Sequence, residues 1–160
     1  MAKGTEETSS SANEAYVAPE LYGSYRFKVD AKGRISLPAK FRKVLSRDLI
    51  VSRELLDRCL YVFEPQAFNE WVDQLFVSKF GGYDPAKSQH VMLKTRLKSN
   101  ANDVEMDSSG RIMVKQGLRD ATGIEKEVVL VGNSGYFEIW DADAYDEKIE
   151  SIDLGTLYSE

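Results

Sequence analysis

The chain has 160 residues, about 42% of them apolar, and a formal net charge of −5 at pH 7. A chain of this length predicts one or two small domains, and each half-size domain would have a thin core. No segment approaches the roughly 18 to 20 apolar residues that cross a membrane, which argues against a membrane protein. The single cysteine cannot form an internal disulfide, and the first twenty residues contain no apolar leader, so we expect a cytoplasmic protein.

The first predicted elements are a polar arm and a strand–turn–strand segment. Residues 1–20 are polar, Ser-rich and acidic, which predicts a flexible arm. In YRFKVD, residues 25–30, apolar and polar side chains alternate as in a strand with one buried face. In the following turn DAKGR, residues 30–34, the Asp30 carboxylate can accept hydrogen bonds from turn amides, and Gly33 supplies the unusual backbone angle. The tip of the expected hairpin presents four bases on one polar surface: Arg26, Lys28, Lys32 and Arg34.

The rest of the chain alternates predicted strands and helices. Pro38 suits the first turn of a helix because its missing N–H costs nothing there. Gly123 marks the end of a later helix, and Asp141 caps the last one. The predicted helices span 38–45, 65–80, 86–99, 115–122 and a segment after residue 141. The predicted strand pairs are 49–53 with 59–63, and 127–132 with 136–140.

The chain repeats itself at an offset of 77 residues. VDAKGRISLPAKFR (29–42) aligns with MDSSGRIMVKQGLR (106–119), with Asp, Gly, Arg, Ile and the final Arg in common. Phe63 and Trp140 match at the same offset. So long a match predicts a duplicated unit of strand, turn, strand, helix and a further strand pair. The second turn repeats three residues of the first: Asp107, Gly110 and Arg111.

The bases of the chain are concentrated around the two turns. Residues 21–47 contain eight bases and one acid, and residues 94–119 contain six bases and three acids, whereas residues 120–160 contain two bases and eleven acids. The local field, and not the net charge, decides where a polyanion docks, so this pattern indicates a nucleic-acid surface near the turns. Charge runs also occur on ordinary solvated faces, and charge alone leaves both interpretations open.

The side chains of a catalytic or metal centre are not grouped in the sequence. His90 is the only histidine, so a Cys/His zinc cluster cannot form, and the other members of a Ser-His-Asp or Cys-His arrangement are not apparent. Cys59 lies in the apolar run CLYVF, which predicts a buried, unreactive thiol. We therefore expect a protein that is not an enzyme, with no metal, cofactor or small-molecule substrate, and with His90 on a helix surface.

Three segments, YGSYRFKVDAKGRISLPAKFR, VEMDSSGRI and EKEVVLVGNSGYFEIWDADAY, resemble the MraZ family of bacterial transcriptional regulators, and the resemblance covers about residues 21–150. It implies an α+β, mostly β fold, in which tandem AbrB-like swapped-hairpin units form an intrachain pseudo-dimer barrel with flanking helices. The expected segments are an arm over 1–20, a first unit with its helix over 21–80, a connecting helix over 81–100, and a second unit with a C-terminal helix over 101–153.

The resemblance also implies a function. Members of the family form homo-oligomeric rings of about eight subunits, an octamer in the typical case. They bind double-stranded DNA at short G-rich direct repeats upstream of the division and cell-wall gene cluster, and they usually repress it, including their own gene. A cytoplasmic, nucleoid-associated repressor is therefore expected.

Individual residues receive roles from the same resemblance. The family's DNA-reading arginines correspond to Arg34 and Arg111, and its basic turn residue corresponds to Lys32. An arginine at a turn tip can donate two hydrogen bonds to a guanine in the major groove, worth about 1–3 kcal/mol of discrimination. The bases expected to contact phosphates are Arg26, Lys28, Lys32 and, as a further candidate, Lys98. The turn-structuring residues are Asp30, Gly33, Asp107 and Gly110.

Other interpretations stay open. An Asp–Arg pair four residues apart can lock a hairpin without touching DNA. The second unit departs from the family pattern, because Lys115 stands where the family has a proline. The alternative to a DNA-binding regulator is a ring-forming scaffold or antitoxin-like protein-binding module, which would use the acidic C-terminal helix and the apolar face of the helix at 65–80. A small hydrolase is a more remote third interpretation.

Overall fold

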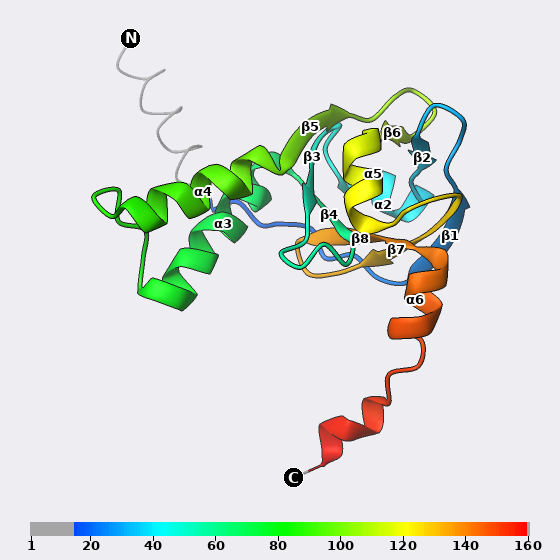
Figure 1. Cartoon of the computed structure of the whole chain (residues 1–160). Coiled ribbons are helices and arrows are strands. Elements are labelled where there is room, and N and C mark those ends of the chain that lie inside the picture. The colour runs from blue at the N-terminus through cyan, green and yellow to red at the C-terminus, as the bar shows by residue number, and fades with distance from the viewer. Residues whose placement is uncertain (1–14, 160) are drawn as a thin grey trace.

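The fold combines antiparallel strands with helices packed around them (Figure 1). The computed structural model describes residues 15–159. Six strands form one sheet in the order β1-β7-β8-β4-β3-β5, and two short strands form a separate ladder, β2-β6. The strands are β1 Ser24–Lys28, β2 Arg34–Ser36, β3 Asp48–Arg53, β4 Leu60–Phe63, β5 Ala101–Glu105, β6 Arg111–Met113, β7 Glu127–Gly132 and β8 Tyr136–Asp141. The helices are α2 Ala39–Val44, α3 Pro65–Phe80, α4 Ser88–Ser99, α5 Gln116–Thr122, α6 Ala142–Lys148 and a 3-10 helix, η1 Leu154–Tyr158.

The predicted helices and the two predicted strand pairs are confirmed, with shifts of one or two residues at their ends. Local chemistry explains the boundaries. Pro38 occupies the N-cap of α2, immediately before its first turn. Gly123 ends α5 in the left-handed conformation, with φ of 72°. Asp141 caps α6, where its side chain accepts a hydrogen bond from the backbone amide of Ala144.

The two halves of the chain exchange strands. β1 of the first half pairs with β7 of the second, and β5 of the second half pairs with β3 of the first. The cross-pairing continues in the ladders β2–β6 and β4–β8, which join matching strands of the two repeats. The two repeats, which lie 77 residues apart in the sequence, are therefore related by an approximate two-fold axis within one chain.

The exchange corrects the expectation that the turn at residues 30–34 joins two strands of one hairpin. The turn itself is closed, because Gly33 N donates to Asp30 O and Asp30 N donates to Arg34 O, both at 3.0 Å. The flanking strands nevertheless separate, since β1 pairs with β7 and β2 pairs with β6. An isolated hairpin is only marginally stable, and crossing over lets both repeats bury their apolar faces in one core.

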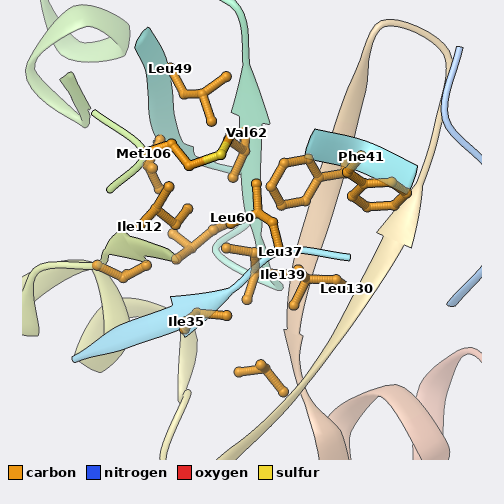
Figure 2. Packing of buried hydrophobic residues seen from close by; sticks show 14 of the residues in the cluster. Ile35, Leu37, Phe41, Leu49, Leu60, Val62, Met106, Ile112, Leu130 and Ile139 are labelled. Atoms are coloured by element: carbon orange, nitrogen blue, oxygen red, sulfur yellow. The ribbon is translucent and has the colours of Figure 1, made fainter. Parts of the chain in front are cut away.

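The main core draws on both halves of the chain (Figure 2). Ile35 and Ile112, from matching strands, are both 0% exposed, as are Leu60 and Ile139 from β4 and β8. Burying one such side chain contributes about 1.5–3 kcal/mol. Because the same cluster contains residues from each half, neither half keeps a complete core when it is alone.

A second, mostly aromatic cluster packs α3 against β3 and β4 of the six-stranded sheet. It is centred on Phe63, Phe68, Val72 and Phe76, all of which are buried. The apolar face predicted for this helix is therefore a packing face within the chain, with Trp71 only partly buried at its margin.

His90 is buried, so the prediction that it lies on a helix surface is wrong. Its side chain is 4% exposed, and its ring centroid lies 4.1 Å from that of Phe80 and 5.6 Å from that of Phe76. The backbone amide of Asp84 donates to His90 Nδ1 at 3.0 Å, which satisfies the buried imidazole. The cause is the return of the chain after Gly81, which ends α3 and lets α4 pack back along it.

Two other sequence predictions concern Cys59 and the N-terminal arm. Cys59 is buried as predicted, and burial raises the pKa of its thiol well above the usual range. Of the expected arm, residues 15–20 are described by the structure. Within them, the Tyr16 hydroxyl donates to Glu64, and Ala18 packs against the aromatic cluster. Residues 1–14 of the expected arm lie outside the described residues.

Candidate nucleic-acid interface

The candidate site is built on the β2–β6 ladder, in which two three-residue strands lie antiparallel. The register is symmetric about the pair Ile35 and Ile112, and it places Arg34 opposite Met113. Both isoleucines are fully buried, and side chains alternate along a strand, so Arg34 and Arg111 project from the outer face of the ladder. The structure thus brings the two arginines predicted from the sequence onto one surface.

Asp30 locks the first turn through three hydrogen bonds. Its Oδ1 accepts from the backbone amides of Lys32 and Arg34, at 2.9 and 2.8 Å. Its Oδ2 accepts from Arg34 Nε at 2.7 Å. The carboxylate therefore fixes both the backbone of the turn and the orientation of the arginine that follows it.

The second turn repeats this arrangement bond for bond. Asp107 Oδ1 accepts from the amides of Ser109 and Arg111, both at 2.9 Å, and Asp107 Oδ2 accepts from Arg111 Nε at 3.0 Å. The two turns also meet, because Arg111 Nη1 lies 4.0 Å from Asp30 Oδ2. In each turn the aspartate therefore accepts hydrogen bonds from two backbone amides and from the arginine four residues later.

The hydrogen bonds to the two carboxylates also set their charge state. The backbone amide of Arg34, the largest favourable contact, lowers the pKa of the Asp30 carboxyl to about 2. The amide of Arg111 likewise lowers the pKa of Asp107. Each guanidinium uses Nε for this lock, and within residues 15–159 the terminal nitrogens of Arg34 make no further hydrogen bond. One arginine side chain can therefore bind the aspartate of its turn through Nε and still donate hydrogen bonds outward from its terminal nitrogens.

Gly33 and Gly110 are required by both conformation and space. Their φ values are 84° and 78°, in the left-handed region that side chains rarely adopt. A Cβ on Gly33 would lie 2.8 Å from the Arg119 guanidinium and 3.0 Å from the Val114 carbonyl oxygen, and a Cβ on Gly110 would clash with the Arg42 side chain. Each turn is therefore covered by an arginine from the helix of the opposite half.

Arg42 and Arg119 are thus structural members of the site that were not predicted from the sequence. Arg119 donates from Nε to the Val114 carbonyl oxygen at 3.0 Å, which anchors it beside the first turn. The signal that could have identified them is the repeat itself, because both are the final arginine of the aligned segments. Arg42 also places α2, with its neighbours Lys40 and Lys43 exposed, at the second turn.

The other predicted bases lie in different surroundings. Lys32 is exposed at the tip of the first turn, and Lys28 is exposed at the end of β1, in register with Glu127. Arg26 is paired with Asp146 of α6 and lies 3.8 Å from Glu127, so acids already surround its charge. Lys98 lies away from the turns on α4, where its Nζ contacts Asn69 and the ring of Phe68.

Within residues 15–159, no three His, Cys, Asp or Glu side chains are grouped to hold a metal ion. No helix in this part of the chain has the length and apolar character needed to cross a membrane. The two-turn surface is the arrangement that best combines duplicated geometry with positive charge.

Comparison with known proteins identifies relatives that match most of the chain. The family model described as "MraZ protein, putative antitoxin-like" matches residues 21–82 and 97–154. A protein named Transcriptional regulator MraZ from Nitrosomonas europaea is 36% identical over 142 residues, covering 86% of this chain and 90% of its own. A protein of the same name from Symbiobacterium thermophilum is 38% identical over 138 residues, covering 86% of this chain and 94% of its own.

A third relative with this name, from Treponema denticola, is 32% identical over 132 residues, covering 81% of this chain and 88% of its own. The matched segments include both turns, both helices that cover them and the strands that the halves exchange. Each of these relatives is named a transcriptional regulator. The chain belongs to the MraZ family.

Proposed function

We propose that this protein is a sequence-specific, DNA-binding transcriptional regulator that reads base edges with Arg34 and Arg111. The observation that supports this most strongly is the pair of identically locked arginines on the outer face of one ladder. From strand rise and spacing, their Cα atoms are about 8 Å apart, which corresponds to two or three base steps. A two-stranded β-ribbon fits the major groove, about 12 Å wide.

The lock supports base reading because it organises each arginine before DNA arrives. With Nε held by Asp30 or Asp107, the guanidinium plane is fixed, and little side-chain freedom is lost on binding. The terminal nitrogens can then donate to O6 and N7 of a guanine. In this mechanism the Asp–Arg pair has both roles considered for it: it closes the turn, and it holds the arginine in position to read DNA.

Phosphate contacts would come from the bases beside the turns. Lys32 and Lys28 are exposed there and would set the register of the protein on the duplex. Arg26 would have to leave Asp146 before it could contact a phosphate, which predicts a smaller contribution. Lys98 would contribute only if DNA reached α4.

We further propose the finer features that family membership suggests. The two repeats form AbrB-like swapped-hairpin units, an assignment supported by the exchange of strands between the halves. Copies of the chain assemble into a ring of about eight subunits, so that several weak sites meet successive direct repeats on DNA. The regulator represses the division and cell-wall gene cluster, including its own gene, at G-rich repeats, and works in the cytoplasm at the nucleoid.

A protein-binding role is the second candidate. It is favoured by the apolar side chains exposed on α3 and α4, among them Val77, Val91 and Met92. The scaffold or antitoxin-like alternative would place the partner there and leave the turns without DNA. A protein partner that copurifies at moderate salt, with no DNA retained, would favour this candidate.

DNA binding by matched variants tests the proposed function. Random DNA is first selected on the wild-type protein, and the enriched duplex is then titrated with Arg34→Ala, Arg111→Ala and, as a control, Lys148→Ala at an exposed base of α6. A lost bidentate contact is worth about 1–3 kcal/mol, which predicts roughly 5- to 150-fold weaker binding for either arginine variant. Unchanged affinity and sequence preference in both arginine variants would contradict the proposal, as would an equal loss for Lys148→Ala.

A further inference from the structure

An apolar groove runs between α3 and α4, at a distance in the fold from the two turns. Its volume is about 410 Å³, and its lining includes Leu55, Phe80, Leu93 and Leu97. Leu55 is 56% exposed, Leu93 is 42% exposed and Phe80 is 37% exposed. The volume falls within the range of about 300–1,000 Å³ typical of ligand sites, and solvent-exposed apolar surface of this kind marks interaction sites.

The loop that contributes Leu55 is held rigidly. Glu54 is 4% exposed, and its carboxylate accepts from the amides of Leu56 and Arg58, at 3.1 and 3.0 Å. Asp57 has a positive φ of 58° and accepts two hydrogen bonds from the Arg53 guanidinium, at 2.8 and 2.7 Å. The loop is therefore ordered before any partner binds, which lowers the entropy cost of docking against it.

The C-terminal segment carries the complementary feature. After α6, residues 152–158 expose four large apolar side chains: Ile152 at 54%, Leu154 at 73%, Leu157 at 82% and Tyr158 at 92%. In the 3-10 helix η1, side chains three residues apart share a face, so Leu154 and Leu157 point the same way. The side chain of Asp153 caps η1 by accepting a hydrogen bond from the amide of Gly155. This bond stabilises the helical turn from within the segment.

The groove and the segment also match in charge. Residues 149–159 contain two acids, Glu150 and Asp153, and no base. Lys79 is the charged residue among those that line the groove. Beside the groove, α4 contains three bases and no acid, whereas α3 contains two acids, Glu70 and Asp73, that are not among the lining residues. Figure 1 shows η1 extending from α6 away from the sheet, whereas α3 and α4 lie at the other end of the body. In this conformation the segment does not reach the groove of its own chain.

We propose that residues 152–158 of one copy dock in the α3–α4 groove of a neighbouring copy. Leu154 and Leu157 enter the groove against Leu93 and Leu55, and Glu150 and Asp153 lie toward the bases of α4. The two surfaces differ, so the contact is heterologous and propagates from copy to copy until a ring closes. The inference rests on the ring assembly proposed above and names the contact that builds it.

Solution mass of matched variants tests this contact. Leu157→Asp in the tail and Leu93→Asp in the groove are compared with Ser159→Asp and Met92→Asp, which add the same charge beside each surface. Light scattering should show a large assembly for the wild type and both controls, and a single chain of 18.1 kDa for the two test variants. The thermal melt of Leu157→Asp should be that of a folded chain, because η1 makes its hydrogen bonds within residues 153–159. A test variant that keeps the wild-type mass, or a monomeric wild type, would overturn the proposal.

Cross-linking identifies the occupant of the groove. Chains with Leu157→Cys and Leu93→Cys are mixed under mild oxidation, and Met113→Cys serves as an exposed control on β6. The native Cys59 is buried and does not compete. We expect a disulfide-linked dimer only in the mixture of the two test chains. Dimers formed by Leu157→Cys alone would show tail-to-tail pairing and overturn the docking, and so would the absence of a cross-link in the mixture.

DNA binding by the same variants separates this inference from the proposed function. If docking builds the assembly, Leu157→Asp keeps its affinity for a duplex with one repeat and loses the added affinity for a duplex with several. If the wild type prefers no DNA sequence while its mass still falls on Leu157→Asp, the proposed function fails and the docking stands. If DNA binding is specific and the mass does not change, the docking fails alone.

Discussion

The two turns of this protein share one set of hydrogen bonds and differ in the charge of the residues around it. Asp30 and Asp107 accept the same three hydrogen bonds, and the arginine four residues later is held in the same way. Around them the first copy has Lys32 where the second has Ser109. The helix after the first turn, α2, contains three bases and no acid, whereas α5 contains one base and one acid. Duplication has kept the geometry that aims a guanidinium, and the surrounding charge has diverged.

The core beneath the turns gives the largest expected effect. Ile35→Ala and Ile112→Ala each remove a fully buried side chain from the centre of the ladder, at a cost of about 2–5 kcal/mol in the free energy of unfolding. The two should cost nearly the same, because these side chains face each other across the approximate two-fold. Denaturant unfolding of each variant measures this. A difference of more than about 2 kcal/mol between them would show that the halves are not equivalent in the core.

Replacing the glycines of the turns should have a smaller effect on the free energy of unfolding, and the effect should differ between the two turns. Gly33→Ala meets the Val114 carbonyl oxygen, which cannot move cheaply, whereas Gly110→Ala meets the flexible Arg42 side chain. With left-handed strain of about 1–2 kcal/mol in each case, Gly33→Ala should be the more destabilising. Gly117→Ala in α5 is the control, since its Cβ meets nothing and should stabilise the helix by about 0.5–1 kcal/mol. Equal costs at Gly33 and Gly110 would contradict this account.

These effects also show how much could be predicted from the sequence. Alternation in residues 25–30 identified the buried face correctly, because it depends only on which side chains point inward. It could not reveal that β1 lies beside β7, since many antiparallel partners fit the same alternation. His90 was placed wrongly for a similar reason, because its burial depends on how α4 folds back after Gly81.

The candidate site was predictable where the chemistry is local. The Asp30-to-Arg34 spacing indicated a closed turn, and the structure contains it. The meeting of the two turns through Arg111 and Asp30 was not predictable, because it requires the exchange of strands. The role of Arg42 was missed for the same reason: its partner Gly110 belongs to the other half of the chain.

Exchanging the turn residues Lys32 and Ser109 should shift the salt dependence of DNA binding. Lys32→Ser removes one phosphate contact, so the slope of log K against log salt should become shallower by about 1. Ser109→Lys should make the slope steeper by a similar amount, if the second turn approaches DNA as closely as the first. Titrations at several salt concentrations measure both. If neither variant changed the slope, these turns would not be part of the DNA interface.

The carboxylates of the two locks predict a small dependence of stability on pH. The pKa of Asp30 falls from about 3.9 in the unfolded chain to about 2 in the fold, so its contribution is present above about pH 4 and is lost as the pH falls toward 2. Asp107 shifts in the same direction. Unfolding of Asp30→Asn should therefore show less loss of stability than the wild type between pH 4 and 2. A wild-type stability that rises as the pH falls through this window would contradict the lock.

The most direct test of the central claim couples Arg34 to a single guanine atom. Duplexes containing the selected repeat are made with 7-deazaguanine at each guanine in turn, which removes only the N7 acceptor. At one position the replacement should weaken binding of the wild type roughly 5-fold or more, the lower end of a lost base contact, and should have no further effect on Arg34→Ala. If every position affects the wild type and Arg34→Ala by the same factor, Arg34 closes its turn but does not read DNA.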